Sequence, residues 1–103
     1  MWLFVFFDLP TNTAKERKYA ALFRKSLLND GFIMKQYSVY MRHCPSKQIA
    51  NVHVERVKCD IPVRGSVTIC MITDKQFGKM INYEAHEQVP ALERPVQMEF
   101  ELF

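Results

Sequence analysis

The start of the chain is apolar on both sides, and this constrains its fold more than any other feature. Residues 1–8, Met-Trp-Leu-Phe-Val-Phe-Phe-Asp, predict a short strand that ends in a carboxylate. Side chains alternate across a strand and form two sets here, Leu3, Val5 and Phe7 on one face and Trp2, Phe4, Phe6 and Asp8 on the other. A chain this short can cover one face with its own helices. We expect the second face to meet another subunit, with Asp8 where that subunit arrives.

The length and composition of the chain are typical of one intracellular domain. Its 103 residues form a single domain, residues 1–103, that is large enough to bury a core. The net charge of +3 permits a polyanionic partner without requiring one. The three cysteines lack framework spacing, which favours a reducing compartment. The apolar segments fall short of the roughly 20 residues of a membrane helix, so we expect a soluble, cytoplasmic protein without a membrane partner.

A helix is predicted after the turn at Leu9-Pro10. Residues 13–16 match a capping box, in which the Thr13 hydroxyl accepts from the third helical amide and Glu16 reaches back. The helix runs to about Asp30, and Gly31 is suited to a left-handed end. The core-facing stripe at helical spacing consists of Tyr19, Phe23 and Leu27, with Leu22 and Ser26 beside them.

The middle of the chain predicts further strands around a second helix. Residues 32–42 are rich in aromatic and β-branched side chains and predict one long strand or two short ones. Residues 45–46 open a helix, and residues 60–62 end it because proline disfavours helix in the residue before it. Residues 65–73 alternate like a strand, entered by a turn at Arg64-Gly65. The inner side of the second helix is expected to carry Ile49, Val52 and Val57.

The last third of the chain is predicted to be a connection followed by a strand. Residues 74–95 carry mixed charge, Gly78 and two prolines, and a short helix is possible at 76–83. So long a connection is expected to travel some distance. Residues 96–103 alternate as a half-buried or edge strand, which could add to a partner's sheet edge.

The order of elements indicates a ferredoxin-like α+β sandwich, βαββαβ, with an additional C-terminal strand. Both helices would cover one sheet face and leave the other open. Monomers rarely expose so large an apolar patch, so we expect a homodimer through the open face. The expected interface residues are Trp2, Phe4 and Phe6 from the first strand and Val96, Met98 and Phe100 from the last.

Asp8 is the sharpest chemical candidate. A carboxylate that ends a buried strand at a dimer seam is suited to Mg²⁺, which takes one or two carboxylates, keeps several waters and uses them against phosphate. A two-fold dimer would bring Asp8 onto its own copy and supply two carboxylates. The alternative is structural, because aspartate before Leu-Pro also forms turns.

Basic residues of the first helix are the second candidate. They lie off the apolar stripe, and residues seven apart share one side of a helix, so such a strip can contact phosphates without reading bases. A solvated helix face is the alternative. The predicted nucleic-acid-binding residues are Lys15, Arg17, Lys18, Arg24 and Lys25, extended by Arg42.

An ordered set of motifs resembles a known family, the second CRISPR-associated protein, the small partner of the CRISPR spacer-integration enzyme. The matching segments are residues 4–10, Arg17, residues 36–40, residues 65–67 and residues 73–78. They run along nearly the whole chain in order. Residues 36–43 and 73–78 look most like members from type II systems.

The resemblance implies a ferredoxin-like homodimer whose sheets pack face to face and whose final strand pairs with the neighbouring protomer. It implies that Asp8 is the metal-binding and catalytic aspartate of a magnesium-dependent endonuclease acting on single-stranded RNA or double-stranded DNA. It also implies a scaffold role in spacer acquisition, in which the dimer bridges integrase dimers and supports the protospacer duplex.

The resemblance leaves two questions open. Some nuclease-active relatives carry an arginine where this chain has Met34, and the loss of that cation weakens the case for efficient cleavage. The alternative function on the same fold is a stand-alone endoribonuclease of toxin type. A small-molecule-sensing module is a third hypothesis, which would need a polar pocket at a seam that is apolar here.

Overall fold

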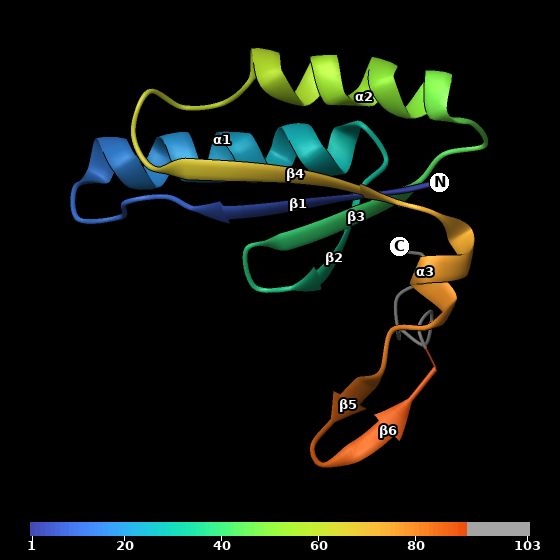
Figure 1. Ribbon diagram of the computed structural model, residues 1–103. Helices are drawn as coiled ribbons and strands as arrows, with labels where there is room; N and C mark the ends of the chain where they lie inside the picture. Colours follow the sequence, from blue (N-terminus) through green and yellow to red (C-terminus); the bar gives the residue numbers. More distant parts are fainter. Residues whose placement is uncertain (91–103) are drawn as a thin grey trace. The chain divides into compact units, whose positions relative to one another are not determined.

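The computed structural model describes residues 1–90, and its contacts divide the chain into two compact units, Met1–Ile72 and Thr73–Phe103. The first unit is α+β with the element order βαββαβ, as the sequence predicts (Figure 1). Its strands form one antiparallel sheet in the order β2-β3-β1-β4, which is consistent with a ferredoxin-like fold. Its elements are β1 (Trp2–Asp8), α1 (Ala14–Asn29), β2 (Ile33–Gln36), β3 (Val39–His43), α2 (Lys47–Cys59) and β4 (Ser66–Ile72).

The core lies between the two helices and one face of the sheet (Figure 1). Leu3, Val5 and Phe7 of β1 are buried there against Phe23 and Leu27 of α1. The predicted alternation of β1 is therefore correct. On the opposite face of β1 the exposure of the side chains changes along the strand. Trp2 and Phe4 are already buried in the single chain, whereas Phe6 is 41% exposed.

The inner side of α1 agrees with the predicted stripe in its second half and differs from it in the first half. Phe23 and Leu27 are buried as expected, but the residue that continues their line is Ala20, and Tyr19 and Leu22 are 41% and 52% exposed. Ala20 has a small side chain, so a prediction that selects large apolar side chains favours Tyr19, whereas Ala20 is the buried residue.

The inner side of α2 also differs from the prediction. Ala50, His53 and Val57 are its buried residues, whereas Ile49 and Val52 are 41% and 46% exposed. Val57 was placed correctly. The buried ring of His53 is satisfied by a hydrogen bond to the Asp30 carboxylate. The spacing of apolar residues along the sequence does not reveal this partner.

The segment 32–42 forms two strands joined by a tight turn at Tyr37 and Ser38. Ser38 has a φ of 61°, and its carbonyl accepts a 3.0 Å hydrogen bond from the backbone N–H of Phe7, so the turn is tied to β1. Gly31 ends α1 with a φ of +88°, as predicted.

The described part of the second unit contains α3 (Asp74–Gly78) and a hairpin of β5 (Asn82–Glu84) with β6 (Glu87–Val89). The predicted helix at 76–83 is wrong in position, because a capping box of Thr73 with Gln76 starts the helix earlier. The hairpin was missed because its turn, Ala85 and His86 at φ 50° and 72°, contains no glycine. The predicted strand 96–103, with Val96, Met98 and Phe100, lies outside the described residues, and its pairing with a partner stays a prediction.

Within residues 1–90, none of the helices has the length and apolar character needed to cross a membrane. This agrees with the hydropathy of the sequence.

Candidate functional site

Asp8 lies exposed at the end of β1, on the sheet face opposite the helices. It stands directly across from Ser66 of β4, and Phe6 stands across from Thr68, so these side chains share one face. They surround a shallow hollow of about 320 Å³ in the first unit. Its lining is made of Phe6, Phe7, Asp8, Tyr37, Ser38, Val39, Ser66 and Thr68.

The loop before β4 touches the end of β1 through Gly65. This glycine has a φ of +93°, and a Cβ atom there would lie 2.6 Å from the backbone oxygen of Asp8. Only glycine accepts both that conformation and that approach without strain. The contact places Arg64 beside Asp8, and the two residues line a second hollow of about 390 Å³ together with Pro10 and Gly65.

The sequence pattern predicts for Arg64 only a turn entering a strand, and its place beside Asp8 was not predicted. The signal that could have found it is the antiparallel pairing of β1 with β4, which sets the end of the first strand beside the start of the fourth. A glycine immediately before β4 marks the close approach.

The donor atoms around Asp8 are oxygens. The described residues contain no group of three His, Cys, Asp or Glu side chains that could enclose a metal ion. Asp8 provides one carboxylate, and the hydroxyl-bearing residues Ser38, Ser66 and Thr68 line the same hollow. This set fits Mg²⁺, which prefers oxygen, needs one or two carboxylates and retains waters.

The basic residues of α1 lie on the other side of the sheet from the Asp8 side chain, because α1 packs on the core face. Lys15, Arg17, Lys18 and Lys25 are exposed, and Arg24 is half-buried. Arg17 donates a 3.0 Å hydrogen bond from Nη1 to the Thr11 carbonyl, which ties its head group to the turn before the helix. The strip therefore exists as a surface of α1, but the structure does not bring it into the Asp8 hollow.

Arg24 contributes to the electrostatics of the core face. Burial raises the pKa of the Tyr40 hydroxyl above its ordinary value, and the positive charge of Arg24 opposes that rise. The charge of Arg24 thus reaches an inward-facing tyrosine of β3.

Arg42 has a structural contact at the far end of β1. Its Nη1 donates a 2.8 Å hydrogen bond to the backbone oxygen of Asp30, at the C-terminal cap of α1. A Cβ atom on Gly31 would collide with the same guanidinium at 1.8 Å. Arg42 pairs in register with Leu3, so it sits at the opposite end of the strand from Asp8.

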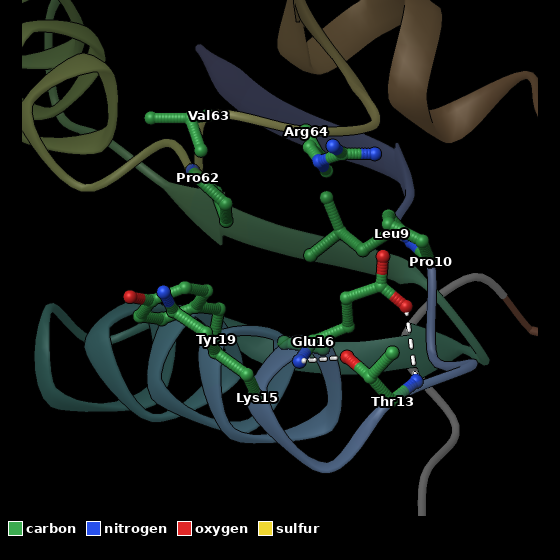
Figure 2. A pocket seen from close by; sticks show the side chains of 10 residues that line it. Leu9, Pro10, Thr13, Lys15, Glu16, Tyr19, Pro62, Val63 and Arg64 are labelled. Carbon is green, nitrogen blue, oxygen red and sulfur yellow. Dashed lines mark hydrogen bonds between the residues drawn. The ribbon is translucent and has the colours of Figure 1, made fainter.

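A larger cavity of about 460 Å³ lies between the start of α1 and the loop before β4 (Figure 2). Figure 2 shows Val63 and Arg64 from that loop across from Lys15 and Tyr19 of α1. Glu16 points its carboxylate back to the backbone N–H groups of the helix cap, in the predicted capping box. Lys15 is thus the predicted basic residue that shares a cavity with Arg64.

A second charged cluster joins the two helices. His53 Nδ1 lies 2.7 Å from Asp30 Oδ2, and Arg56 Nη1 lies 2.8 Å from Asp30 Oδ1. Burial on its own would raise the pKa of the Asp30 carboxyl, but the hydrogen bonds and charges of His53 and Arg56 outweigh it and hold that pKa below its ordinary value. The arrangement holds the helices together and is separate from the Asp8 hollows.

Comparisons with known proteins give one consistent result. A family model described as "CRISPR associated protein Cas2" matches residues 1–80. The "CRISPR-associated endoribonuclease Cas2" of Parvibaculum lavamentivorans is 48% identical over 99 residues, which cover 96% of this chain and 98% of that protein. The protein of the same name from Flavobacterium psychrophilum is 48% identical over 103 residues, which cover 100% of this chain and 88% of that protein. A further similar protein of that name, from Streptococcus mutans, is 42% identical over 81 residues, 79% of this chain and 74% of its own length.

Proposed function

The chain belongs to the Cas2 family of CRISPR-associated proteins, and from this premise we propose that it serves CRISPR adaptation as a dimeric scaffold with a metal-dependent phosphodiesterase site at Asp8. The observation that supports the site is the exposed Asp8 carboxylate beside Arg64, in oxygen-lined hollows at the end of β1. Relatives named as endoribonucleases support the reaction class.

Each residue of the site has a distinct part in this proposal. Asp8 holds the metal ion, with the copy of Asp8 from the second protomer as the other carboxylate. Mg²⁺, when bound, stabilises negative charge on the phosphate and lowers the pKa of a bound water. Arg64, which is always charged, neutralises a phosphate oxygen beside Asp8, a charge that Met34 does not supply.

The scaffold part of the proposal concerns duplex DNA. The exposed cations of α1 contact backbone phosphates of a protospacer, while the dimer bridges integrase dimers of a type II system. Such binding reads charge rather than sequence, so affinity falls steeply with salt. The residues proposed for this surface are Lys15, Arg17, Lys18, Arg24 and Lys25. Arg42, the sixth predicted residue, is left out of the proposed surface because its guanidinium donates to the Asp30 carbonyl oxygen.

The dimer proposed here uses the sheet face that carries Asp8. Phe6 is the large apolar side chain of β1 that remains exposed on that face, and it is two residues from Asp8. Trp2 and Phe4 lie on the same face of β1 but are already buried in the single chain, so Phe6 carries the exposed part of the proposed interface with the neighbouring protomer.

The alternative function is a stand-alone endoribonuclease. The printed names of the relatives favour RNA as substrate, and this alternative needs no integrase. It predicts RNA cleavage and growth arrest by the protein alone.

The deciding experiment is cleavage of labelled duplex DNA and single-stranded RNA by the purified protein, with magnesium, with chelator and as Asp8→Asn. The matched control is Asp60→Asn, which makes the same change at an exposed carboxyl outside both Asp8 hollows. Cleavage that needs metal and Asp8 but tolerates Asp60→Asn supports the phosphodiesterase site. Salt-sensitive duplex binding without Asp8-dependent cleavage leaves the scaffold alone.

A further inference from the structure

Tyr37 is an aromatic residue that the packing of the fold does not use. Its side chain is 94% exposed, although it sits in a turn that is firmly held. The next residue, Ser38, has a φ of 61° and accepts the backbone N–H of Phe7 at 3.0 Å. The backbone of the turn is therefore held beside the end of β1, next to Phe7 and Asp8, and the Tyr37 ring extends from it into solvent.

Tyr37 and Asp8 line the same hollow. The hydroxyl-bearing residues Ser66 and Thr68 form its other side, across β1 from the turn. An exposed aromatic ring and hydroxyl groups around a shallow, open space make a surface suited to a flat polar ligand, and a metal ion at the carboxylate would hold an adjoining phosphate.

We propose that Tyr37 is a base-stacking residue, whose ring receives an unpaired base of a single-stranded RNA while the adjoining phosphate lies at Asp8. This rests on the proposed phosphodiester site and adds to it a residue that would hold the unpaired base. Aromatic rings stack on bases that are unstacked and splayed out, and hydroxyl side chains can bond to base edges or to the ribose 2′-hydroxyl.

The exposure of the ring also explains why a duplex is a poorer ligand at this position. Both faces of a base inside a duplex are covered by its neighbours, so the Tyr37 ring has no face to stack on. Arg64, in the adjacent hollow beside Asp8, binds phosphate in either kind of nucleic acid. Tyr37 therefore separates single strands from duplexes, and Arg64 does not.

The test measures binding in an Asp8→Asn background, so that cleavage does not enter. Single-stranded RNA carrying the fluorescent base 2-aminopurine is titrated with Asp8→Asn alone and combined with Tyr37→Ala, Tyr37→Phe or Tyr83→Ala. Tyr83 is the matched control, an exposed tyrosine of the second unit. We expect Tyr37→Ala to weaken single-strand binding about tenfold and to abolish the quenching of 2-aminopurine by stacking.

The remaining variants fix the interpretation. Tyr37→Phe keeps the stacking face and should bind like the parent, and Tyr83→Ala should leave binding unchanged. Duplex affinity should be the same with and without Tyr37. Equal losses on duplex and single strand, unchanged binding by Tyr37→Ala, or a dimer lost with Tyr37→Ala in sedimentation would each overturn the proposal.

The proposed function and this inference fail in different experiments. Absence of Asp8-dependent cleavage would remove the phosphodiesterase, yet Tyr37-dependent quenching would still establish the base subsite. Asp8-dependent cleavage with no effect of Tyr37→Ala on quenching would keep the enzyme and reject the subsite.

Discussion

The ring of His53 lies 2.7 Å from the carboxylate of Asp30, measured from Nδ1 to Oδ2, and so joins the middle of α2 to the C-terminal cap of α1. Arg56 occupies the other carboxylate oxygen at 2.8 Å, and Arg42 donates to the backbone oxygen of the same aspartate. Asp30 thus links both helices and β3. Because the contact between His53 and Asp30 is largely shielded from water, its loss should affect the whole first unit.

The first prediction concerns the stability contributed by Asp30. Asp30→Ala should lower the free energy of unfolding by about 2–3 kcal/mol, since it leaves the buried His53 without its charged partner. The comparison is Glu55→Ala, which removes an exposed ion pair with Lys58 and should change stability by less than about 1 kcal/mol. Urea denaturation followed by circular dichroism measures both. Similar small losses for the two variants would show that the Asp30 cluster is not a stabilising contact.

The second prediction is the pH dependence of the same cluster. The pKa of Asp30 is lower in the folded protein than in the unfolded chain, so its stabilisation is fully present above the unfolded value near 4. It is lost as the pH falls through the folded pKa, because both states then bind the proton. Asp30→Asn should therefore lose stability at neutral pH and show a flatter decline between about pH 5 and pH 2 than the parent. Parallel pH profiles for the parent and the variant would contradict the assignment.

How much of the site could be foreseen depends on how local its causes are. The capping box of Thr13 with Glu16, the left-handed Gly31 and the alternation of β1 are set by neighbouring residues, and all three were predicted correctly. Asp8 was likewise placed at a strand end because the apolar run stops there.

The features that the sequence did not predict depend on distant partners. The buried His53 bonds to Asp30, which lies 23 positions earlier in the chain, so its partner cannot be read from local spacing. Arg64 lies beside Asp8 because β1 pairs with β4. On α1, Phe23 and Leu27 were predicted correctly, but Tyr19 was predicted to be buried where the small side chain of Ala20 is the buried one.

The third prediction tests the close approach at Gly65. Gly65→Ala should destabilise the protein by more than about 1 kcal/mol, because a Cβ atom would meet the Asp8 carbonyl oxygen at 2.6 Å in a left-handed conformation. Gly78→Ala is the control, since a Cβ atom there meets nothing within 4 Å. Thermal unfolding measures both variants. Equal melting temperatures for Gly65→Ala and the parent would mean that the loop before β4 is free to move away from Asp8.

The fourth prediction concerns Arg64. If its guanidinium binds a phosphate beside Asp8, Arg64→Gln should weaken nucleic-acid binding and reduce the slope of log affinity against log salt by about 1. The loss should be equal for single-stranded RNA and duplex DNA, in contrast to the effect expected for Tyr37. Lys58→Gln, which removes an exposed cation of α2 that pairs with Glu55, is the control and should leave the slope unchanged. An unchanged slope for Arg64→Gln would remove this residue from the phosphate site.

The last prediction separates the solvent-facing cations of α1 from Arg42 of β3, whose guanidinium bonds to the end of α1. Lys18 and Lys25 are exposed and seven residues apart, so they share one side of the helix. The double variant Lys18→Gln with Lys25→Gln should lower the salt slope of duplex binding by about 1.8, as expected for two lost phosphate contacts, with little change in stability.

Arg42→Gln should lower the stability of the protein and leave the salt slope of duplex binding unchanged, because Arg42 Nη1 donates to the Asp30 carbonyl oxygen. Anisotropy titrations at several salt concentrations, with unfolding curves for the same variants, measure both quantities. A slope lowered by Arg42→Gln at unchanged stability would place Arg42 on the DNA-binding surface and contradict its assignment to the end of α1.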